Sequence, residues 1–266
     1  MSNLDLWKQF TQARIGLKRF GGSISTKEML QFRLDHAKAK DAVVQEPQWD
    51  AIQLGINQIS NQYGIPNFFV KSKISSKQEY LLRPDLGRRL SEESIHKLNS
   101  QNKGYNLGLV CVDGLSAKAI DNHLLNFLDI FLKKIKTSKL KLAPLVYTQW
   151  GRVAIGDEIS EILNTKLCLV IIGERPGLTS SDSLGLYLTY DPKVGNTDET
   201  RNCISNVRPL GLPIPDAVEK INYLINECLV QGQSGVLLKD QMPTDTKSLN
   251  VEKNILKLEE DTKDTK

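Results

Sequence analysis

One stretch limits the possible folds of this 266-residue chain more than any other: an unbroken apolar run that ends in a charged turn. Residues 167–172 read LCLVII, which is typical of a β-strand buried on both faces of a sheet. The sequence GERPG at 173–177 follows directly, and its two glycines and proline favour a tight, exposed turn. Ligands of open α/β sheets bind beyond the carboxyl ends of the strands. This turn, with Glu174 and Arg175, is therefore a candidate binding site.

A second apolar run at 184–190 and a polar segment at 196–206 follow the turn. We predict a loop for the polar segment because it contains few apolar residues. Its notable polar side chains are those of Arg201, Asn202, Cys203 and Asn206. Such polarity between buried strands suits a binding loop, and it equally suits a segment that only caps strand ends.

The overall composition excludes several classes of protein. An apolar fraction of 40% and a charged fraction of 25% are ordinary for a soluble globular protein. A dispersed net charge of +4 and 6% aromatic residues argue against a nucleic-acid-binding protein. No segment approaches the ~20 consecutive apolar residues of a membrane span, and the N-terminus lacks the layout of a signal peptide. The four cysteines have no paired spacing, so we expect a reduced cytoplasmic compartment.

Three histidines far apart in the sequence do not suggest a metal site. They are His36, His96 and His123. We expect no metal ligand in this chain, and we interpret His123 as a residue on the surface of an amphipathic helix.

Helical patterns dominate the N-terminal quarter of the chain. A modest apolar stripe at 1–20 predicts a docking helix. The S-x-x-E pattern at 25–28 is a capping box that predicts a helix to about residue 43, with Leu30, Leu34 and Ala37 on its apolar face. Another helix is expected from Pro47 to about Gly64. We therefore assign residues 1–66 to an N-terminal helical segment.

Strands and helices alternate from residue 67 onward. Apolar runs predict strands at 68–74, 107–112 and 142–147, the last near a sheet edge because it contains Pro144. The alternation argues for an α/β fold with a mostly parallel, doubly wound, Rossmann-like sheet at 67–240. Residues 241–266 contain five lysines and six acids, which predicts a charged flexible tail.

Three arginines gather in the segment RPDLGRR: Arg83, Arg88 and Arg89. Guanidinium groups suit carboxylate or phosphate recognition, although a surface loop of ion pairs is the plainer interpretation. Our hypothesis is that this loop contacts a partner subunit. An independent enzyme that uses Arg83, Arg88 and Glu174 on a phosphorylated substrate is the other possibility, and the lack of a phosphate-loop motif weighs against it.

Several blocks, in one order between about residues 10 and 240, resemble the small subunit of ethanolamine ammonia-lyase, an adenosylcobalamin-dependent enzyme. The most specific are RPDLGRRL at 83–90, GERPGL at 173–178 and RNCISNVRP at 201–209. The resemblance implies a larger TIM-barrel partner subunit that holds ethanolamine and the catalytic side chains, in a hetero-oligomer of higher order. It also implies that the α/β domain binds cobalamin between the two subunits.

The family's cobalamin contacts map by resemblance onto Val153, Glu174 and Cys203. We expect Glu174 to accept hydrogen bonds from corrin amides or a ribose hydroxyl, and Val153 and Cys203 to offer backbone groups and packing. The implied reaction converts ethanolamine to acetaldehyde and ammonia by a radical mechanism, with no catalytic residue on this chain.

One alternative function stays open beside this one. It is a non-catalytic assembly protein of an ethanolamine-utilisation microcompartment. We expect the chain in the cytoplasm, within a bacterial microcompartment.

Overall fold

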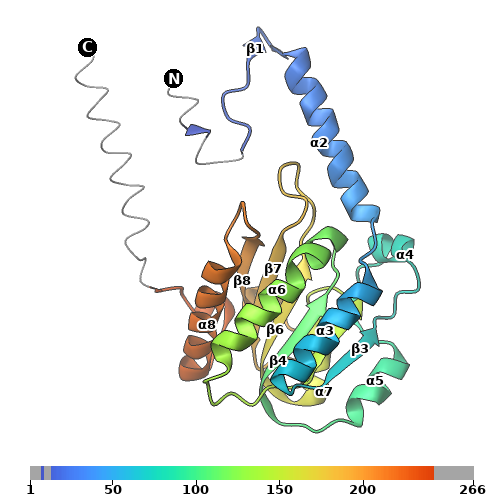
Figure 1. Cartoon of the computed structure of the whole chain (residues 1–266), viewed down its shortest axis with the longest axis vertical. Coiled ribbons are helices and arrows are strands. Elements are labelled where there is room, and N and C mark those ends of the chain that lie inside the picture. The colour runs from blue at the N-terminus through green and yellow to red at the C-terminus, as the bar shows by residue number, and fades with distance from the viewer. Residues whose placement is uncertain (1–6, 9–12, 243–266) are drawn as a thin grey trace, which may run out of the picture.

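A computed structural model describes residues 7–8 and 13–242 of the chain (Figure 1). Its strands are β1 (Arg19–Phe20), β2 (Ser23–Ile24), β3 (Asn67–Lys71), β4 (Tyr105–Val112), β5 (Leu145–Gln149), β6 (Thr165–Gly173), β7 (Leu184–Tyr190) and β8 (Arg201–Val207). Its helices are α2 (Thr26–Val44), α3 (Trp49–Tyr63), α4 (Lys77–Leu82), α5 (Glu92–Asn99), α6 (Ala117–Ile135), α7 (Ile155–Leu163) and α8 (Ile214–Gln231). Short 3₁₀ turns occupy Leu86–Arg88, Asp198–Thr200 and Gly235–Leu237.

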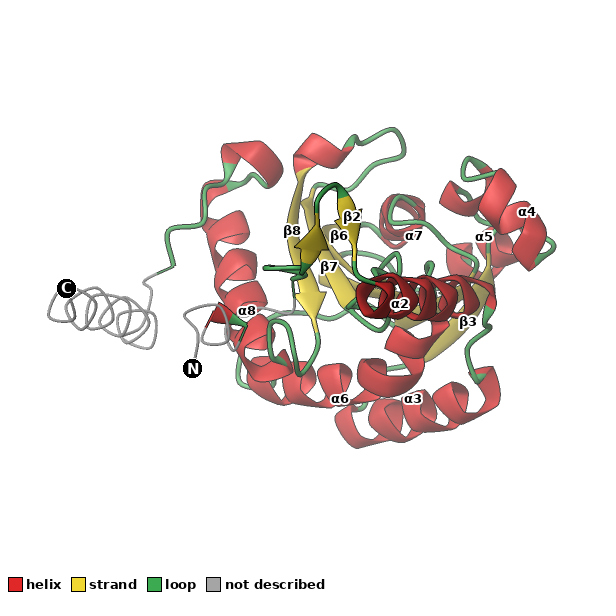
Figure 2. Ribbon diagram, turned by 90° about the horizontal axis from the view of Figure 1, so that it is seen from above, coloured by secondary structure: helices red, strands yellow, loops and turns green. Residues whose placement is uncertain are grey.

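The centre of the fold is a six-stranded sheet in the order β3-β5-β4-β6-β7-β8. The first four strands are parallel, and β7 is antiparallel to both of its neighbours. Helices α3, α6 and α8 pack on one face, and α5 and α7 pack on the other (Figure 2). The predicted α/β fold with a mostly parallel, doubly wound sheet is confirmed.

Strand β6 lies inside this sheet and is buried on both faces, as predicted. Leu169 and Ile171 belong to the apolar cluster under α6, whereas Val170 and Ile172 belong to the cluster under α7. Alternate side chains of a strand point to opposite faces, so an unbroken apolar run satisfies both clusters at once.

One prediction about the sheet is wrong. Residues 201–207 form β8 and not a loop: the side chains of Arg201, Ile204 and Val207 are buried, and the strand can carry many polar residues because it lies at the sheet edge. Strand β5 lies near an edge, as predicted: it is the second strand of the sheet and pairs with the edge strand β3 and with β4. Pro144 precedes β5, so its missing N–H removes no hydrogen bond from the strand ladder.

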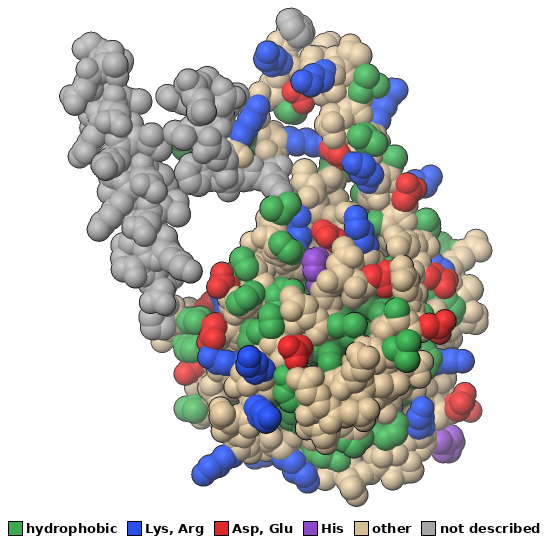
Figure 3. All heavy atoms as spheres, in the orientation of Figure 1, with side chains coloured by type: hydrophobic (Ala, Val, Ile, Leu, Met, Phe, Trp, Pro, Cys, Tyr) green, Lys and Arg blue, Asp and Glu red, His purple; other side chains and the backbone are tan. Residues whose placement is uncertain are grey.

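Helix α2 begins at the predicted capping residue, because Ser25 Oγ accepts a hydrogen bond from the Glu28 amide at 3.3 Å. The helix extends away from the sheet (Figure 1), and Ala42 is its buried residue. The predicted apolar face therefore lies outside the core: the side chains of Leu30 and Leu34 are 59% and 48% exposed. Figure 3 shows basic and apolar side chains together on this projecting part of the molecule.

The two ends of the chain leave some predictions outside the described residues. The N-terminal docking helix falls mostly on residues 1–12, and the described residues 13–18 form no helix. The tail at 243–266 also lies outside the described part. The division at residue 66 stays a prediction; α3, which precedes it, packs Ile52 and Ile56 into the core of the sheet. No helix of the described part has the length and hydropathy to cross a bilayer.

Candidate functional site

The loops that follow β4, β5 and β6 meet at the carboxyl edge of the sheet. The Leu115 amide, after β4, donates a 3.0 Å hydrogen bond to the carbonyl of Gly173, the last residue of β6. Gly114 has a φ of +61°, and a Cβ there would collide with the Gly173 carbonyl oxygen. Glycine is therefore required at 114 for both the backbone conformation and the close approach of the two loops.

This edge contains a cavity of about 500 Å³, which we call the Glu174 cavity. It is lined by Tyr80, Gly114, Leu115, Arg152, Val153, Ile172, Gly173, Glu174, Arg175, Tyr187 and Ser205. The structure thus brings two of the three predicted site residues, Val153 and Glu174, into one wall. The wall combines apolar side chains with charged groups at Arg152, Glu174 and Arg175, a pattern typical of ligand pockets.

One carboxylate oxygen of Glu174 is hydrogen-bonded within the protein, and the other has no hydrogen-bond partner among the described residues. Its Oε2 accepts hydrogen bonds from the Ser183 hydroxyl at 2.6 Å and from the Asn206 amide at 3.0 Å. Its Oε1 makes no hydrogen bond to the described residues, and a Cβ at Gly185 would lie only 3.1 Å from it. Glu174 therefore offers a fixed acceptor to a ligand with N–H or O–H groups.

Cys203, the third predicted residue, lies outside the lining of this cavity. It is exposed on β8, directly opposite Tyr187 of β7, and Tyr187 does line the cavity. Val153 lies in the turn before α7, and its carbonyl accepts a hydrogen bond from the Gly156 amide at 3.1 Å. Val153 also packs beside the apolar cluster under α7, so it offers a firm apolar wall.

A second cavity of about 610 Å³ lies beside the first, and we call it the arginine cavity. It is lined by Pro84, Asp85, Arg88, Arg89, Arg152, Val153, Ala154 and residues 194–198. The two cavities share Arg152 and Val153. Two of the three arginines singled out in the sequence, Arg88 and Arg89, therefore line a cavity that adjoins the Glu174 cavity.

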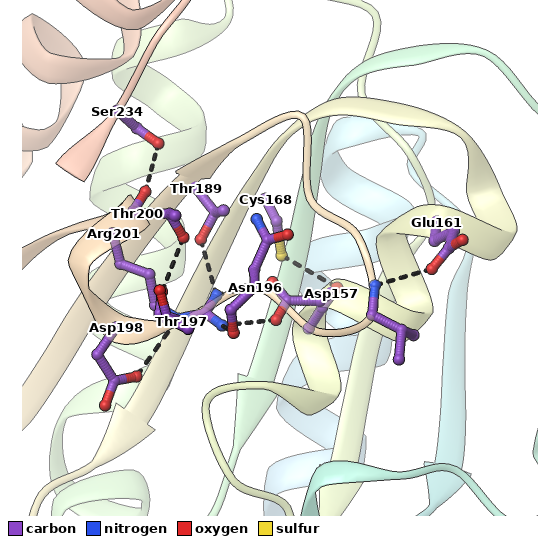
Figure 4. Close-up of polar contacts among 12 residues, drawn as sticks. Asp157, Glu161, Cys168, Thr189, Asn196, Thr197, Asp198, Thr200, Arg201 and Ser234 are labelled. Atoms are coloured by element: carbon purple, nitrogen blue, oxygen red, sulfur yellow. Dashed lines mark hydrogen bonds and ion pairs between the residues drawn. The ribbon is translucent and has the colours of Figure 1, made fainter. Parts of the chain in front are cut away.

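A buried ion pair fixes the loop at 194–198. The guanidinium of Arg201 donates to both carboxylate oxygens of Asp157, at 2.7 and 2.6 Å, and to the Asn196 carbonyl at 3.0 Å (Figure 4). Both charged side chains are only 2% exposed. On the same loop, the Val194 amide donates to Glu161 on α7 at 2.9 Å. The wall of the arginine cavity is thus tied to α7 by two separate anchors.

A cluster of buried polar groups, which we did not predict from the sequence, lies next to these cavities. Asp113 is fully buried, and neither of its carboxylate oxygens has a well-formed hydrogen bond to the described residues. Burial raises the pKa of Asp113 to about 7, against the opposing effects of the amides of Trp150, Gly151 and Gly114 and the charge of Lys77. Desolvation lowers the pKa of Lys77, whose Nζ is also buried without a hydrogen-bond partner there.

One sequence signal could have found Asp113. It follows β4 directly, as Glu174 follows β6, so it obeys the same rule for the carboxyl ends of strands. Trp150, at the end of β5, has a φ of +55°, which is uncommon for a bulky residue. Backbone strain of this kind is common at functional sites, but no sequence pattern predicts it.

The interpretation of His123 as a surface residue is wrong. The side chain is 8% exposed, because the loop after β6 folds over α6 and places Asp182 at 3.4 Å from its Nε2. Within the described residues, no cluster of histidine, cysteine or acidic side chains could hold a metal ion.

The chain is similar over most of its length to one family of proteins. The family model described as "Ethanolamine ammonia-lyase light chain (EutC)" matches residues 2–239. A relative from Azotobacter vinelandii, named "Ethanolamine ammonia-lyase small subunit", is 43% identical over an alignment of 242 positions that covers 88% of each chain. Relatives of the same name are 44% identical in Pseudomonas aeruginosa, over 88% of this chain and 86% of theirs, and 42% identical in Xanthomonas campestris, over 95% and 96%. The resemblance inferred from the sequence blocks is confirmed.

Proposed function

Because this chain belongs to the ethanolamine ammonia-lyase light-chain family, we propose that it completes an adenosylcobalamin pocket against a large subunit. The family names describe the small subunit of a lyase, so a large-subunit partner is implied. The proposed reaction is the conversion of ethanolamine to acetaldehyde and ammonia, with a TIM barrel as the larger subunit.

The single observation that supports cobalamin binding is the fixed carboxylate of Glu174 in the wall of a cavity at the carboxyl edge of the sheet. A corrin ring is apolar across its face and carries amide side chains at its rim. Its amide N–H groups need acceptors, and Glu174 Oε1 is one that requires no reorganisation. Val153, Leu115 and Ile172 supply the apolar wall that the face of such a ring needs.

Adenosylcobalamin, when bound, supplies an organic radical by homolysis of its cobalt–carbon bond. The proposed work of this chain is binding and orientation. Glu174 accepts hydrogen bonds from the amide groups at the rim of the corrin ring, and Val153 contacts the ring. Cys203 extends the binding surface beyond Tyr187. No residue of this chain is proposed to touch ethanolamine, so its effect on rate acts through the position of the cofactor and the exclusion of water.

Helix α2 supports the proposed partner. Its exposed apolar side chains are Met29, Leu30, Phe32, Leu34 and Val44. Of these, Phe32 has ring contacts within the described part of the chain, with Arg14 and His36. Apolar side chains gathered on a projecting helix are typical of a surface that another chain buries. We propose that the large subunit buries it and that the complex works in the cytoplasm, within a bacterial microcompartment.

Substitution of Glu174 tests the cobalamin site. In Glu174→Gln, the amide oxygen must replace Oε2 to keep the hydrogen bonds from Ser183 and Asn206, so an NH₂ group takes the place of Oε1. The ligand then loses an acceptor, and we expect its affinity to fall by about 10- to 100-fold. Equilibrium ultrafiltration of hydroxocobalamin with the two-subunit complex measures this.

Glu199→Gln is the matched control, because Glu199 is exposed and lines neither cavity. It should leave the affinity unchanged. Equal affinities for the wild-type and Glu174→Gln complexes would refute the role of Glu174 and favour the assembly-protein alternative.

A further inference from the structure

Two guanidinium groups in the arginine cavity are not neutralised by a carboxylate. Of the three arginines in its wall, Arg89 is paired with Glu158 at 2.9 Å. Arg88 and Arg152 have no ion pair with any described residue. Both are therefore available to bind an anion.

The two carboxylates in the wall do not cancel this charge. Asp85 is paired with Arg83, which lies outside the cavity lining, at 2.7 Å. Asp198 is 3.6 Å from Arg201, and its side chain is 98% exposed. Water screens a carboxylate in that position strongly, so it opposes an anion in the cavity only weakly.

The Arg152 side chain is also fixed in position by its contacts with Tyr80. Its guanidinium lies 4.1 Å from the centre of the Tyr80 ring, and its Nη2 donates to the Tyr80 carbonyl at 2.9 Å. Its own amide donates to the Gly87 carbonyl at 2.7 Å. Its Nε is buried and has no hydrogen-bond partner among the described residues. The free donors toward the cavity are on the terminal nitrogens, because Nη1 makes no hydrogen bond to a described residue. A guanidinium fixed in this way binds phosphate oxygens with little loss of side-chain entropy.

The arrangement of the cavities indicates which anion fits. Arg152 and Val153 belong to the walls of both cavities, so one extended ligand can occupy both. Such a ligand would carry hydrogen-bond donors at Glu174 and an anionic group at Arg152 and Arg88. Cobalamin has this distribution: amides surround its corrin ring, and a single phosphodiester lies in its nucleotide tail.

We propose that Arg152 and Arg88 bind the phosphodiester of the cobalamin nucleotide tail in the arginine cavity. This inference rests on the proposed function, because it assumes that the corrin lies at Glu174. It replaces the hypothesis that Arg88 contacts the partner subunit. Arg152 is the main anion-binding residue because it is fixed, and Arg88, on an exposed loop, adds a second charge.

Two corrinoids test the proposal, measured by ultrafiltration and absorbance with the two-subunit complex. Hydroxocobalamin contains the phosphodiester, whereas cobinamide lacks the phosphate, the ribose and the base. We expect Arg152→Met and Arg88→Met to weaken hydroxocobalamin binding by about 10- to 100-fold and about 3- to 10-fold. Cobinamide binding should stay within about twofold in both variants, and Arg152→Lys should recover part of the lost affinity because it keeps the charge.

Lys139→Met is the matched control, because Lys139 is an exposed cation on the segment that joins α6 to β5, at the opposite edge of the sheet. It should change neither affinity. If Arg152→Met does not assemble with the large subunit, Arg88→Met decides the question, since Arg88 stacks on no ring and its loss creates no cavity in the core.

The failures can be told apart. A wild-type complex that binds neither corrinoid overturns the proposed function and this inference together. A wild-type complex that binds hydroxocobalamin, with arginine variants that bind it equally well or lose both corrinoids equally, overturns the inference alone. Binding of inorganic phosphate that depends on Arg152, with unchanged hydroxocobalamin affinity, would assign the site to a free anion. Loss of subunit association in Arg88→Met would restore the subunit-contact hypothesis.

Discussion

Replacing Asp157 with alanine should lower the free energy of unfolding by about 3–5 kcal/mol. Asp157 and Arg201 form a two-point ion pair with both side chains 2% exposed. Burial raises the pKa of Asp157, whereas the hydrogen bonds and charge of Asp157 raise the pKa of Arg201. The large loss on substitution comes from the Arg201 charge, which stays buried without its carboxylate partner.

Asp198→Ala is the matched control, because Asp198 faces the same guanidinium from solvent, at 3.6 Å. We expect it to change the free energy of unfolding by less than about 0.5 kcal/mol. Urea denaturation followed by circular dichroism measures both variants. The double variant Asp157→Leu with Arg201→Met should regain much of the loss, because it leaves no buried charge. Similar losses for Asp157→Ala and Asp198→Ala would contradict this account of the pair.

Asp113 should make the protein less stable as the pH rises from 4 to 8. Its pKa in the folded state is about 7, against 3.8 for an ordinary aspartate, because burial penalises the charged form. A raised carboxyl pKa contributes its stabilisation fully below pH 3.8 and loses it as the pH rises through about 7. The difference between these two pKa values corresponds to about 4 kcal/mol over this range.

Denaturation of the wild type and of Asp113→Asn at pH 5 and pH 8 measures this contribution. The asparagine side chain keeps the shape and cannot ionise, so Asp113→Asn should lack most of the fall in stability and should be the more stable protein at pH 8. Asp41→Asn, at an exposed position of α2, should keep the wild-type dependence. A profile for Asp113→Asn that coincides with that of the wild type would show that Asp113 does not titrate as described.

The sequence predicted the elements whose signal is local. The run at 167–172 showed a strand buried on both faces because its apolar residues are consecutive, and β6 bears this out. Ser25 marked the start of α2 because a cap involves residues only three positions apart. Strand β8 was missed because the burial of Arg201 depends on Asp157, which lies 44 positions earlier in the chain. No local apolar pattern in the sequence marks a buried arginine.

The candidate site was predictable to the same extent. Glu174 follows a strand, so its position at the carboxyl edge could be expected, and it lines a cavity with Val153. Arg152 was missed because its orientation is set by Tyr80, 72 positions earlier, and no spacing rule links the two. The apolar face of α2 was recognised but its exposure was not predicted, since a sequence pattern does not distinguish a face buried by its own chain from an exposed one.

The central claim is that this chain completes a cobalamin pocket and is inactive alone. Ammonia release from ethanolamine with added adenosylcobalamin tests it most directly, with this chain alone, with the large subunit alone and with the two together. The account predicts ammonia only from the two subunits together, and none when adenosylcobalamin is omitted. Ammonia release by this chain alone, or by the large subunit at the same rate without it, would contradict the account.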